Sequence, residues 1–212
     1  MAFFVAENLR KRFGARVVLE NISLSIEEGS VHGIMGPNGA GKTTCFHVLT
    51  GHHRPDGGRI TFEGRDITGK KPHQIARLGI SRSFQIMNLF DDTVVIENVI
   101  LALKQFRSNG MNLLRDVFSD KKLIDQAMDV LDQVGLAHRA WEKAAELPYG
   151  ERRALEIAVA LAPEPRIVFL DEPTSGLGTD ATQALAVLIR KLRARYTIVL
   201  IEHDLRFLFD LA

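Results

Sequence analysis

The chain is poor in the features that mark secreted, membrane-spanning and nucleic-acid-binding proteins. It has one cysteine, Cys45, among 212 residues, which excludes an internal disulfide and fits a reducing compartment. No stretch approaches the roughly 20 apolar residues that span a bilayer, and the apolar start at 3–6 is too short for a signal peptide. The formal net charge is +1, which favours neither nucleic acid nor an anionic membrane as a partner. We therefore expect a soluble chain that binds no nucleic acid and reaches any membrane through another subunit.

The spacing of apolar residues predicts an α/β protein with an inserted block of helices. The expected strands lie within 3–34 and at 59–62, 167–170 and 197–201, and the expected helices lie at 42–50, after Pro72, and at 94–106, 122–134, 148–162 and 180–193. The last two strands are unbroken apolar runs, which indicates parallel strands buried on both faces. We therefore predict a β/α core from residues 1–85 and 163–212, and a helical sub-domain over 86–162.

A glycine-rich segment between a strand and a helix predicts a phosphate site. Gly36-Pro-Asn-Gly-Ala-Gly-Lys42-Thr43 has the P-loop pattern, in which glycines let successive backbone N–H groups converge on one anion. The helix that follows adds the positive end of its dipole. Lys42 supplies a charge to the outer phosphates, and the Thr43 hydroxyl is a candidate Mg²⁺ ligand. The predicted ATP-binding residues here are Gly36, Pro37, Asn38, Gly39, Ala40, Gly41, Lys42, Thr43 and Thr44.

A pair of acids after a buried strand predicts the hydrolytic half of the same site. Asp171 and Glu172 follow the apolar run 167–170, and ligands of such sheets bind at the carboxyl ends of the strands. Asp171 can reach Mg²⁺ through water, and Glu172 can face the water that attacks the γ-phosphate. We find no Asn-Lys-x-Asp guanine reader of the kind that P-loop GTPases usually carry.

These motifs resemble, in order and over nearly the whole chain, those of the ATP-binding cassette (ABC) ATPase family. Residues 147–151 are similar to the family's signature motif, in the sequence variant that is typical of branched-chain amino-acid importers. The resemblance implies a P-loop NTPase (RecA-like) fold with a mostly parallel core, an N-terminal antiparallel β subdomain and an inserted α-helical subdomain. The resemblance assigns Phe13 to adenine stacking, and Gln85 and His203 to catalysis. It implies that Gln85 also binds Mg²⁺, together with Thr43 and Asp171. It places the D-loop at Ser175-Gly176-Leu177-Gly178, and it places the signature, which faces a partner's nucleotide, at Leu147, Pro148, Tyr149, Gly150 and Glu151.

The chain departs from the family pattern at three places. Pro148 stands where the signature has serine, so a hydroxyl and a backbone N–H are both missing. Gly178 stands where the D-loop often has an acidic or amide side chain. The chain ends at Ala212, shortly after His203, so we expect a truncated C-terminus.

The resemblance implies an ATP-binding and ATP-hydrolysing subunit, with ATP and Mg²⁺, that powers an importer for branched-chain or related amino acids. Another cargo (urea, lipid or lipopolysaccharide) and a non-transport ABC ATPase are the alternatives. The implied partners are a second ABC ATPase subunit, identical or related, membrane permease subunits and, indirectly, a periplasmic or extracellular solute-binding protein. The implied location is cytoplasmic, peripheral on the inner face of the cell membrane. The apolar residues Ile86, Met87, Leu89 and Phe90 suit either a groove for a short permease helix or the core of the helical sub-domain.

Overall fold

The computed structural model describes residues 3–37, 39–83, 89–103 and 120–211, which belong to two compact units. The first unit comprises Met1–Arg82, Arg166–Pro173 and Arg193–Ala212, and the second comprises Ser83–Pro165 and Thr174–Leu192. The limits of the inserted helical block, predicted at 86–162, stay a prediction.

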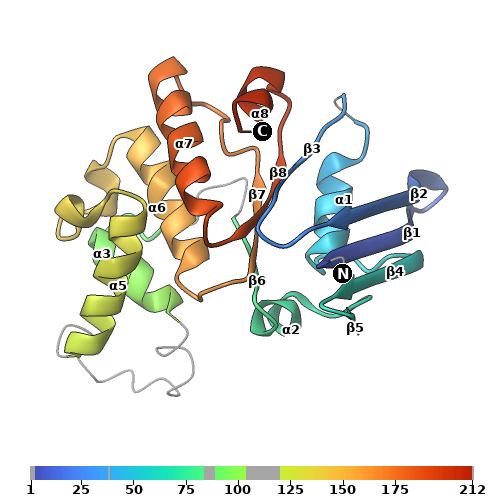
Figure 1. The fold of residues 1–212 in the computed structure, drawn as a ribbon, viewed down its shortest axis with the longest axis horizontal. Helices are drawn as coiled ribbons and strands as arrows, with labels where there is room; N and C mark the ends of the chain where they lie inside the picture. The colour runs from blue at the N-terminus through green and yellow to red at the C-terminus, as the bar shows by residue number, and fades with distance from the viewer. Residues whose placement is uncertain (1–2, 38, 84–88, 104–119, 212) are drawn as a thin grey trace. The chain divides into compact units, whose positions relative to one another are not determined.

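The first unit is built on two four-stranded sheets (Figure 1). The antiparallel sheet has the order β2-β1-β4-β5, with β1 (Phe4–Phe13), β2 (Arg16–Ile26), β4 (Gly57–Phe62) and β5 (Arg65–Asp66). The parallel sheet has the order β3-β8-β7-β6, with β3 (Val31–Ile34), β6 (Ile80–Arg82), β7 (Ile167–Asp171) and β8 (Thr197–Ile201). All residues of β7 and β8 are buried, as their unalternating apolar sequences predict. The predicted α/β class, with a parallel core and an N-terminal antiparallel sheet, is confirmed.

Helix α1 (Lys42–Leu49) joins the two sheets through one apolar core. Phe46 on this helix packs edge-on against Phe169 of β7, with ring centroids 5.5 Å apart. Phe169 in turn contacts Phe4 of β1 at 5.6 Å. Helix α1 also contacts β2 of the antiparallel sheet, so the helix that follows the phosphate loop packs against both sheets. Helices α2 (Pro72–Arg77) and α8 (Leu205–Leu211) complete this unit.

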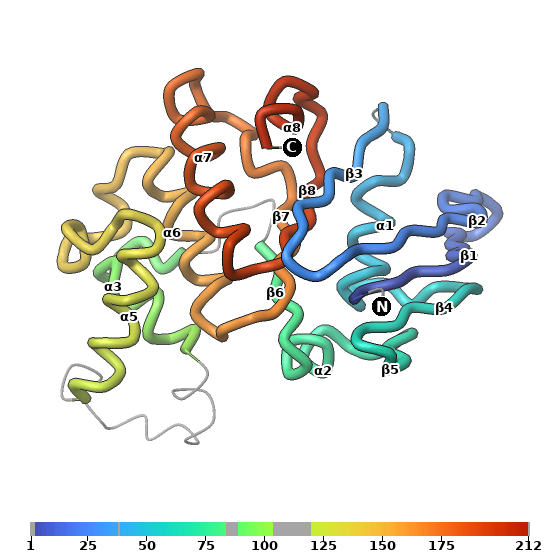
Figure 2. The backbone as a smooth tube through the Cα atoms, viewed as in Figure 1, coloured from blue at the N-terminus to red at the C-terminus, as the bar shows by residue number. Residues whose placement is uncertain are grey.

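The second unit is helical, and Figure 2 traces its helices along the chain. It contains α3 (Val95–Ala102), α5 (Lys121–Gln133), α6 (Tyr149–Leu161), α7 (Thr179–Leu192) and the short 3₁₀ turns Ala137–Arg139 and Ala144–Glu146. Each helix buries an apolar stripe against its neighbours, with Ile96, Leu131, Leu155 and Ile189 at its centre. Within the part of the chain that the structure describes, no helix has the length and apolarity needed to cross a membrane.

Candidate nucleotide site

The phosphate loop runs from the end of β3 to the start of α1, in the first unit. Gly39 and Gly41 have φ values of 81° and 88°, in the left-handed region that side chains disfavour. A Cβ on Gly41 would also lie 2.9 Å from the carbonyl oxygen of Val18, a distance that a real Cβ almost never reaches. Position 41 therefore requires glycine both for its backbone conformation and for lack of space beside Val18. The absence of a side chain lets the loop lie against strand β2.

Lys42 folds back over this loop. Its Nζ donates hydrogen bonds to the carbonyl oxygens of Gly36, at 2.6 Å, and Pro37, at 3.1 Å. The side chain is largely buried, so the ammonium group is held within the loop rather than left in solvent. A phosphate that enters the loop would meet a cation that is already positioned.

A cavity of about 400 Å³ opens in front of the loop, within the range of small-molecule sites. It is lined by Phe13, Arg16, Val18, Gly39, Gly41, Lys42, Thr43, Thr44 and Glu172. The structure thus brings together the predicted adenine aromatic, much of the P-loop and the predicted general base, which lie up to 159 residues apart in the sequence (172 − 13). Gly36, Pro37, Ala40 and Asp171 do not line this cavity, and Asn38 lies outside the described residues.

Phe13 forms one wall of the cavity from the end of β1. The residue is 46% exposed, its ring lies edge-on to His53 with centroids 5.3 Å apart, and Lys11 Nζ lies over the ring at 5.3 Å from its centroid. Arg16 is the direct cross-strand partner of Phe13, so both side chains point to the same side of the sheet. Sequence reasoning missed Arg16, although the short hairpin Phe13-Gly-Ala-Arg16 placed it opposite the aromatic residue.

The two acids after β7 differ in their surroundings. Asp171 is 1% exposed and pairs with Arg82, with Nη2 and Oδ2 3.4 Å apart. Glu172 lines the cavity, and its backbone N–H donates to the carbonyl oxygen of Ile201 at 3.0 Å. Its φ of 45° is in the left-handed region, which is strained for a residue with a side chain and is often found at functional sites.

The structure describes one of the two other predicted catalytic residues, His203. His203 is exposed after β8, and its backbone N–H donates to Oε2 of the buried Glu202 at 3.3 Å. It is not among the residues that line the cavity. Gln85 lies outside the described residues. The assignments of both residues stay predictions.

The predicted signature lies at the start of α6, in the second unit. Leu147 is buried, and Pro148 precedes the first helical turn with φ −53° and ψ 151°. The Tyr149 hydroxyl donates to the carbonyl oxygen of Ser175 at 3.1 Å, so the signature contacts the predicted D-loop. Gly176 in that loop has φ 77°, and a Cβ there would lie 2.9 Å from the Tyr149 hydroxyl oxygen.

Two further signature positions are fixed by neighbouring helices of the same unit. Gly150 faces Ala181 of α7, where an added Cβ would lie 3.2 Å from the alanine Cβ. Glu151 pairs with Arg139, with Oε2 and Nε 3.3 Å apart. Small residues and an ion pair therefore hold the start of α6 in place.

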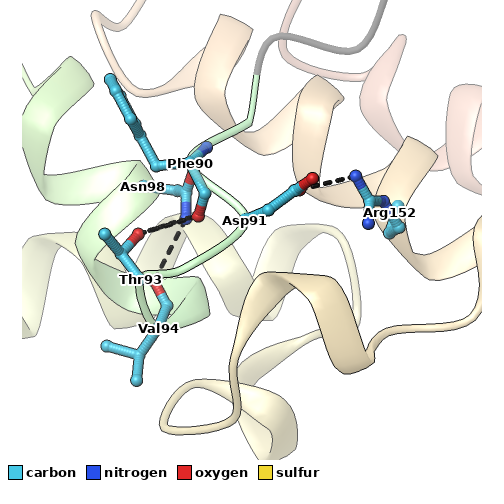
Figure 3. A network of polar contacts seen from close by, with 6 residues as sticks. All are labelled: Phe90, Asp91, Thr93, Val94, Asn98 and Arg152. Carbon is cyan, nitrogen blue, oxygen red and sulfur yellow. Dashed lines mark hydrogen bonds and ion pairs between the residues drawn. The ribbon is translucent and has the colours of Figure 1, made fainter.

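An exposed aromatic residue, Phe90, lies on a hydrogen-bonded turn before α3 (Figure 3). The Asn98 amide Oδ1 accepts from the Phe90 N–H at 2.8 Å, and Nδ2 donates to the Phe90 carbonyl at 3.2 Å and to the Thr93 hydroxyl at 3.0 Å. Asp91 pairs with Arg152 of α6 at 2.6 Å. Phe90 is 59% exposed and does not fill the helical core. Ile86 and Met87 lie outside the described residues.

Three histidines gather at the end of α1, and one of them predicts a pH dependence of stability. Burial, followed by the positive charge of Arg82 and the neighbouring His53 and His52, lowers the pKa of His47 to about 4. Below a pH of about 6.5 the His47 side chain therefore binds a proton in the unfolded chain but stays neutral in the folded chain, and the stability of the fold decreases as the pH drops toward 4.

We expect the melting temperature of His47→Gln, measured by circular dichroism, to decrease less than that of the wild type between pH 7 and pH 5. The exposed His73 on α2 provides the control, because His73→Gln should keep the wild-type slope; equal slopes for all three proteins would contradict the prediction.

The fold and the site define a P-loop nucleoside triphosphatase, because a glycine-rich loop with a held lysine follows a parallel strand and an acid pair ends another strand of the same sheet. Residues 19–175 match the sequence profile of the family described as ABC transporter. The chain belongs to this family as one of its ATP-binding cassettes, and ATP hydrolysis is the general activity of such subunits.

The relatives agree with this assignment. The high-affinity branched-chain amino acid transport ATP-binding proteins BraF of Pseudomonas aeruginosa and LivG of Salmonella typhimurium are each 39% identical to this chain, over 96% of it and 83% of their own length. LivG of Escherichia coli is 37% identical over the same shares. Two solved structures match this chain over 100% of its length and 85% of theirs: a nucleotide-free ATP-binding cassette from an ABC transporter (TM-score 0.87, 30% identical) and the ADP conformation of MJ1267, an ATP-binding cassette of an ABC transporter (TM-score 0.87, 32% identical).

Proposed function

We propose that this chain is the ATP-hydrolysing subunit of an ABC importer for branched-chain or chemically related amino acids. The observation that carries the proposal is the similarity to BraF and LivG, at 39% identity over 96% of the chain, combined with a cavity that joins Phe13, Lys42 and Glu172. The named cargo of those relatives supports the same cargo here. Cargo is selected outside a nucleotide-binding subunit, so urea, lipid and lipopolysaccharide are kept as alternatives for the test.

Magnesium fits the oxygen donors of this site. The Thr43 hydroxyl and the Asp171 carboxylate are hard ligands, and magnesium is usually bound through one or two carboxylates and the substrate phosphates. When bound with ATP, the metal neutralises charge on the phosphates. Thr43 lies at the cavity wall, which supports its role, and Asp171 lies at the end of β7 beside Glu172.

The chain's own residues carry the remaining steps of the proposed mechanism. Phe13 stacks on the base, the loop N–H groups and Lys42 bind the phosphates, and Glu172 takes a proton from the attacking water. His203 helps to orient that water. These roles are proposals that rest on the cavity and on the order of the motifs.

A second cassette completes the proposed active unit. ATP held by one phosphate loop would also contact the start of α6 in the other subunit, with Gly150 allowing a close backbone approach. Because this double contact exists only in the closed pair, ATP binding would drive closure and hydrolysis would release it. The pair of cassettes would lie on the inner face of the cell membrane, in contact with the permease subunits.

Uptake by cells tests the cargo. A strain that lacks this gene should take up labelled leucine, isoleucine and valine more slowly than its parent, and the wild-type gene should restore uptake. Normal amino-acid uptake with reduced uptake of urea would assign the alternative cargo and contradict ours. A purified chain that hydrolyses no ATP in the presence of magnesium would contradict the proposed activity itself.

The turn that carries Phe90 is proposed to contact the permease. Phe90→Ser removes an exposed ring from a turn whose Asn98 hydrogen bonds are made to the backbone of residue 90, so the fold should survive. We expect the free chain to keep its ATPase rate, while amino-acid uptake by cells falls at least about fivefold, in line with loss of one buried aromatic anchor. Val187→Ala on α7, at a residue that is 60% exposed, is the matched control and should leave both readings unchanged. Unchanged uptake in Phe90→Ser would remove this residue from the interface.

A further inference from the structure

A buried arginine contacts the acid that is proposed to serve magnesium. Arg82 ends β6, next to β7, and its side chain is 9% exposed. Its Nη2 lies 3.4 Å from Oδ2 of Asp171, which is 1% exposed. Strands β6 and β7 are paired with Arg82 opposite Phe169, two residues before Asp171, so the guanidinium group reaches along the sheet to the carboxylate.

The same guanidinium group is fixed by the helix that carries the phosphate loop. Its Cζ lies 4.7 Å from the centroid of the Phe46 ring, in cation–π geometry. Its Nη1 donates to the Thr50 hydroxyl at 3.3 Å, and that hydroxyl donates to the Phe46 carbonyl at 2.7 Å. Arg82 therefore links α1, which begins at Lys42, to the acid at the end of β7.

The Arg82 guanidinium group offsets the energetic cost of burying the negative charge of the Asp171 carboxylate. An ionised aspartate at 1% exposure needs a nearby cation or several hydrogen bonds, since burial favours the neutral form. In the proposed mechanism magnesium is held together with the nucleotide phosphates, and Arg82 is the cation that lies beside this carboxylate when no nucleotide is bound. The histidines nearest to Arg82 cannot share this task near neutral pH, because burial and Arg82 itself lower the pKa of both His47 and His52.

We propose that Arg82 is a positioning residue that takes the place of magnesium, orienting the Asp171 carboxylate and supplying a positive charge beside it while the nucleotide site is empty. The inference rests on the proposed role of Asp171 in metal binding. It assigns Arg82 no contact with ATP: the guanidinium group acts through the carboxylate. Magnesium and Arg82 are then alternative sources of positive charge for one acid.

Thermal unfolding of the purified chain tests this exchange. Each protein is melted with a non-hydrolysable ATP analogue in EDTA and again with the analogue and magnesium. In EDTA, Arg82→Met removes the arginine charge beside the buried Asp171, and we expect the melting temperature to fall by about 5–10 °C relative to the wild type. Magnesium should recover a large part of that loss, so the gain from magnesium should be at least about twice the wild-type gain, since the metal adds back the positive charge.

Two further variants separate metal exchange from a merely structural contact. Asp171→Asn in the Arg82→Met background removes the carboxylate charge that has lost Arg82, so it should recover most of the loss in EDTA and abolish the extra gain from magnesium. Arg82→Lys keeps the charge without the planar stacking on Phe46; it should lie between the wild type and Arg82→Met in both readings, and it serves as the test if Arg82→Met does not fold in EDTA.

The outcomes distinguish the two levels of the proposal. If the wild type binds the analogue, and magnesium stabilises Arg82→Met and Arg82→Lys no more than the wild type, Arg82 is a structural residue and the inference is overturned. If the wild type is not stabilised by the analogue in either buffer, the proposed function fails first, and the inference fails with it.

Discussion

Replacement of Glu172 by glutamine is expected to leave ATP bound and almost unhydrolysed. The carboxamide has nearly the shape of the carboxylate but cannot accept a proton, and a general base typically contributes about 10²–10⁴-fold to a rate. Glutamine also tolerates the φ of 45° no worse than glutamate does, so the backbone at the cavity wall should not change. We expect phosphate release to fall at least about 100-fold, while titration with a fluorescent ATP analogue gives an unchanged affinity.

The assignment of the base depends on the contrast between these two measurements. Glu20→Gln, at an exposed position on β2, is a matched control and should keep both rate and affinity. Near-normal phosphate release from Glu172→Gln would show that another group takes the proton. Loss of rate together with loss of ATP affinity would point to a disturbed cavity instead of a missing base.

Replacement of Lys42 by alanine is expected to remove most of the affinity for nucleotides with outer phosphates. The Lys42 ammonium group is held by the carbonyl oxygens of Gly36 and Pro37, at 2.6 and 3.1 Å, so little entropy remains to be lost when it meets a phosphate. A hydrogen bond to a charged group contributes about 1.5–3 kcal/mol, which corresponds to a loss of about 10- to 150-fold in ATP affinity. Calorimetric titration of the purified chain measures this loss.

Comparison of nucleotides and variants sharpens this test. Affinity for AMP should change little, because the lysine of a P-loop reaches the β- and γ-phosphates. Lys191→Ala, an exposed residue on α7, should behave as wild type. Arg16→Gln should produce a loss smaller than that of Lys42→Ala, because Arg16 lines the same cavity from an exposed position. An unchanged ATP affinity in Lys42→Ala would overturn the phosphate site.

The sequence predicts the parts of this fold that depend on local pattern. The apolar runs of β7 and β8 identify buried parallel strands because no polar residue interrupts them. The segment from Gly36 to Thr43 predicts the loop because its glycines and lysine have the spacing of the P-loop pattern. Strand β6 was not predicted, since Ile80–Arg82 is three residues long and has no periodicity to detect. Its position comes from pairing with β7, which is a tertiary contact.

The site shows the same division. Phe13 and Lys42 were found because they belong to recognisable motifs, whereas the contact between Arg82 and Asp171 joins residues 89 positions apart and leaves no trace in the sequence. Arg16 is an intermediate case: its place opposite Phe13 follows from the hairpin, but its position at the cavity wall depends on how the hairpin packs against the phosphate loop.

The close approach of Gly41 to the Val18 carbonyl has a consequence for substrate choice. Because glycine at position 41 lets the hairpin that bears Phe13 lie close to the start of α1, the packing of the protein sets the distance between Phe13, the proposed base-stacking residue, and Lys42, the proposed phosphate-binding residue. The distance between these two residues therefore limits which nucleotides can contact both of them. We expect a nucleotide whose linkage between base and terminal phosphate is longer or shorter than that of ATP to contact Phe13 or Lys42, but not both.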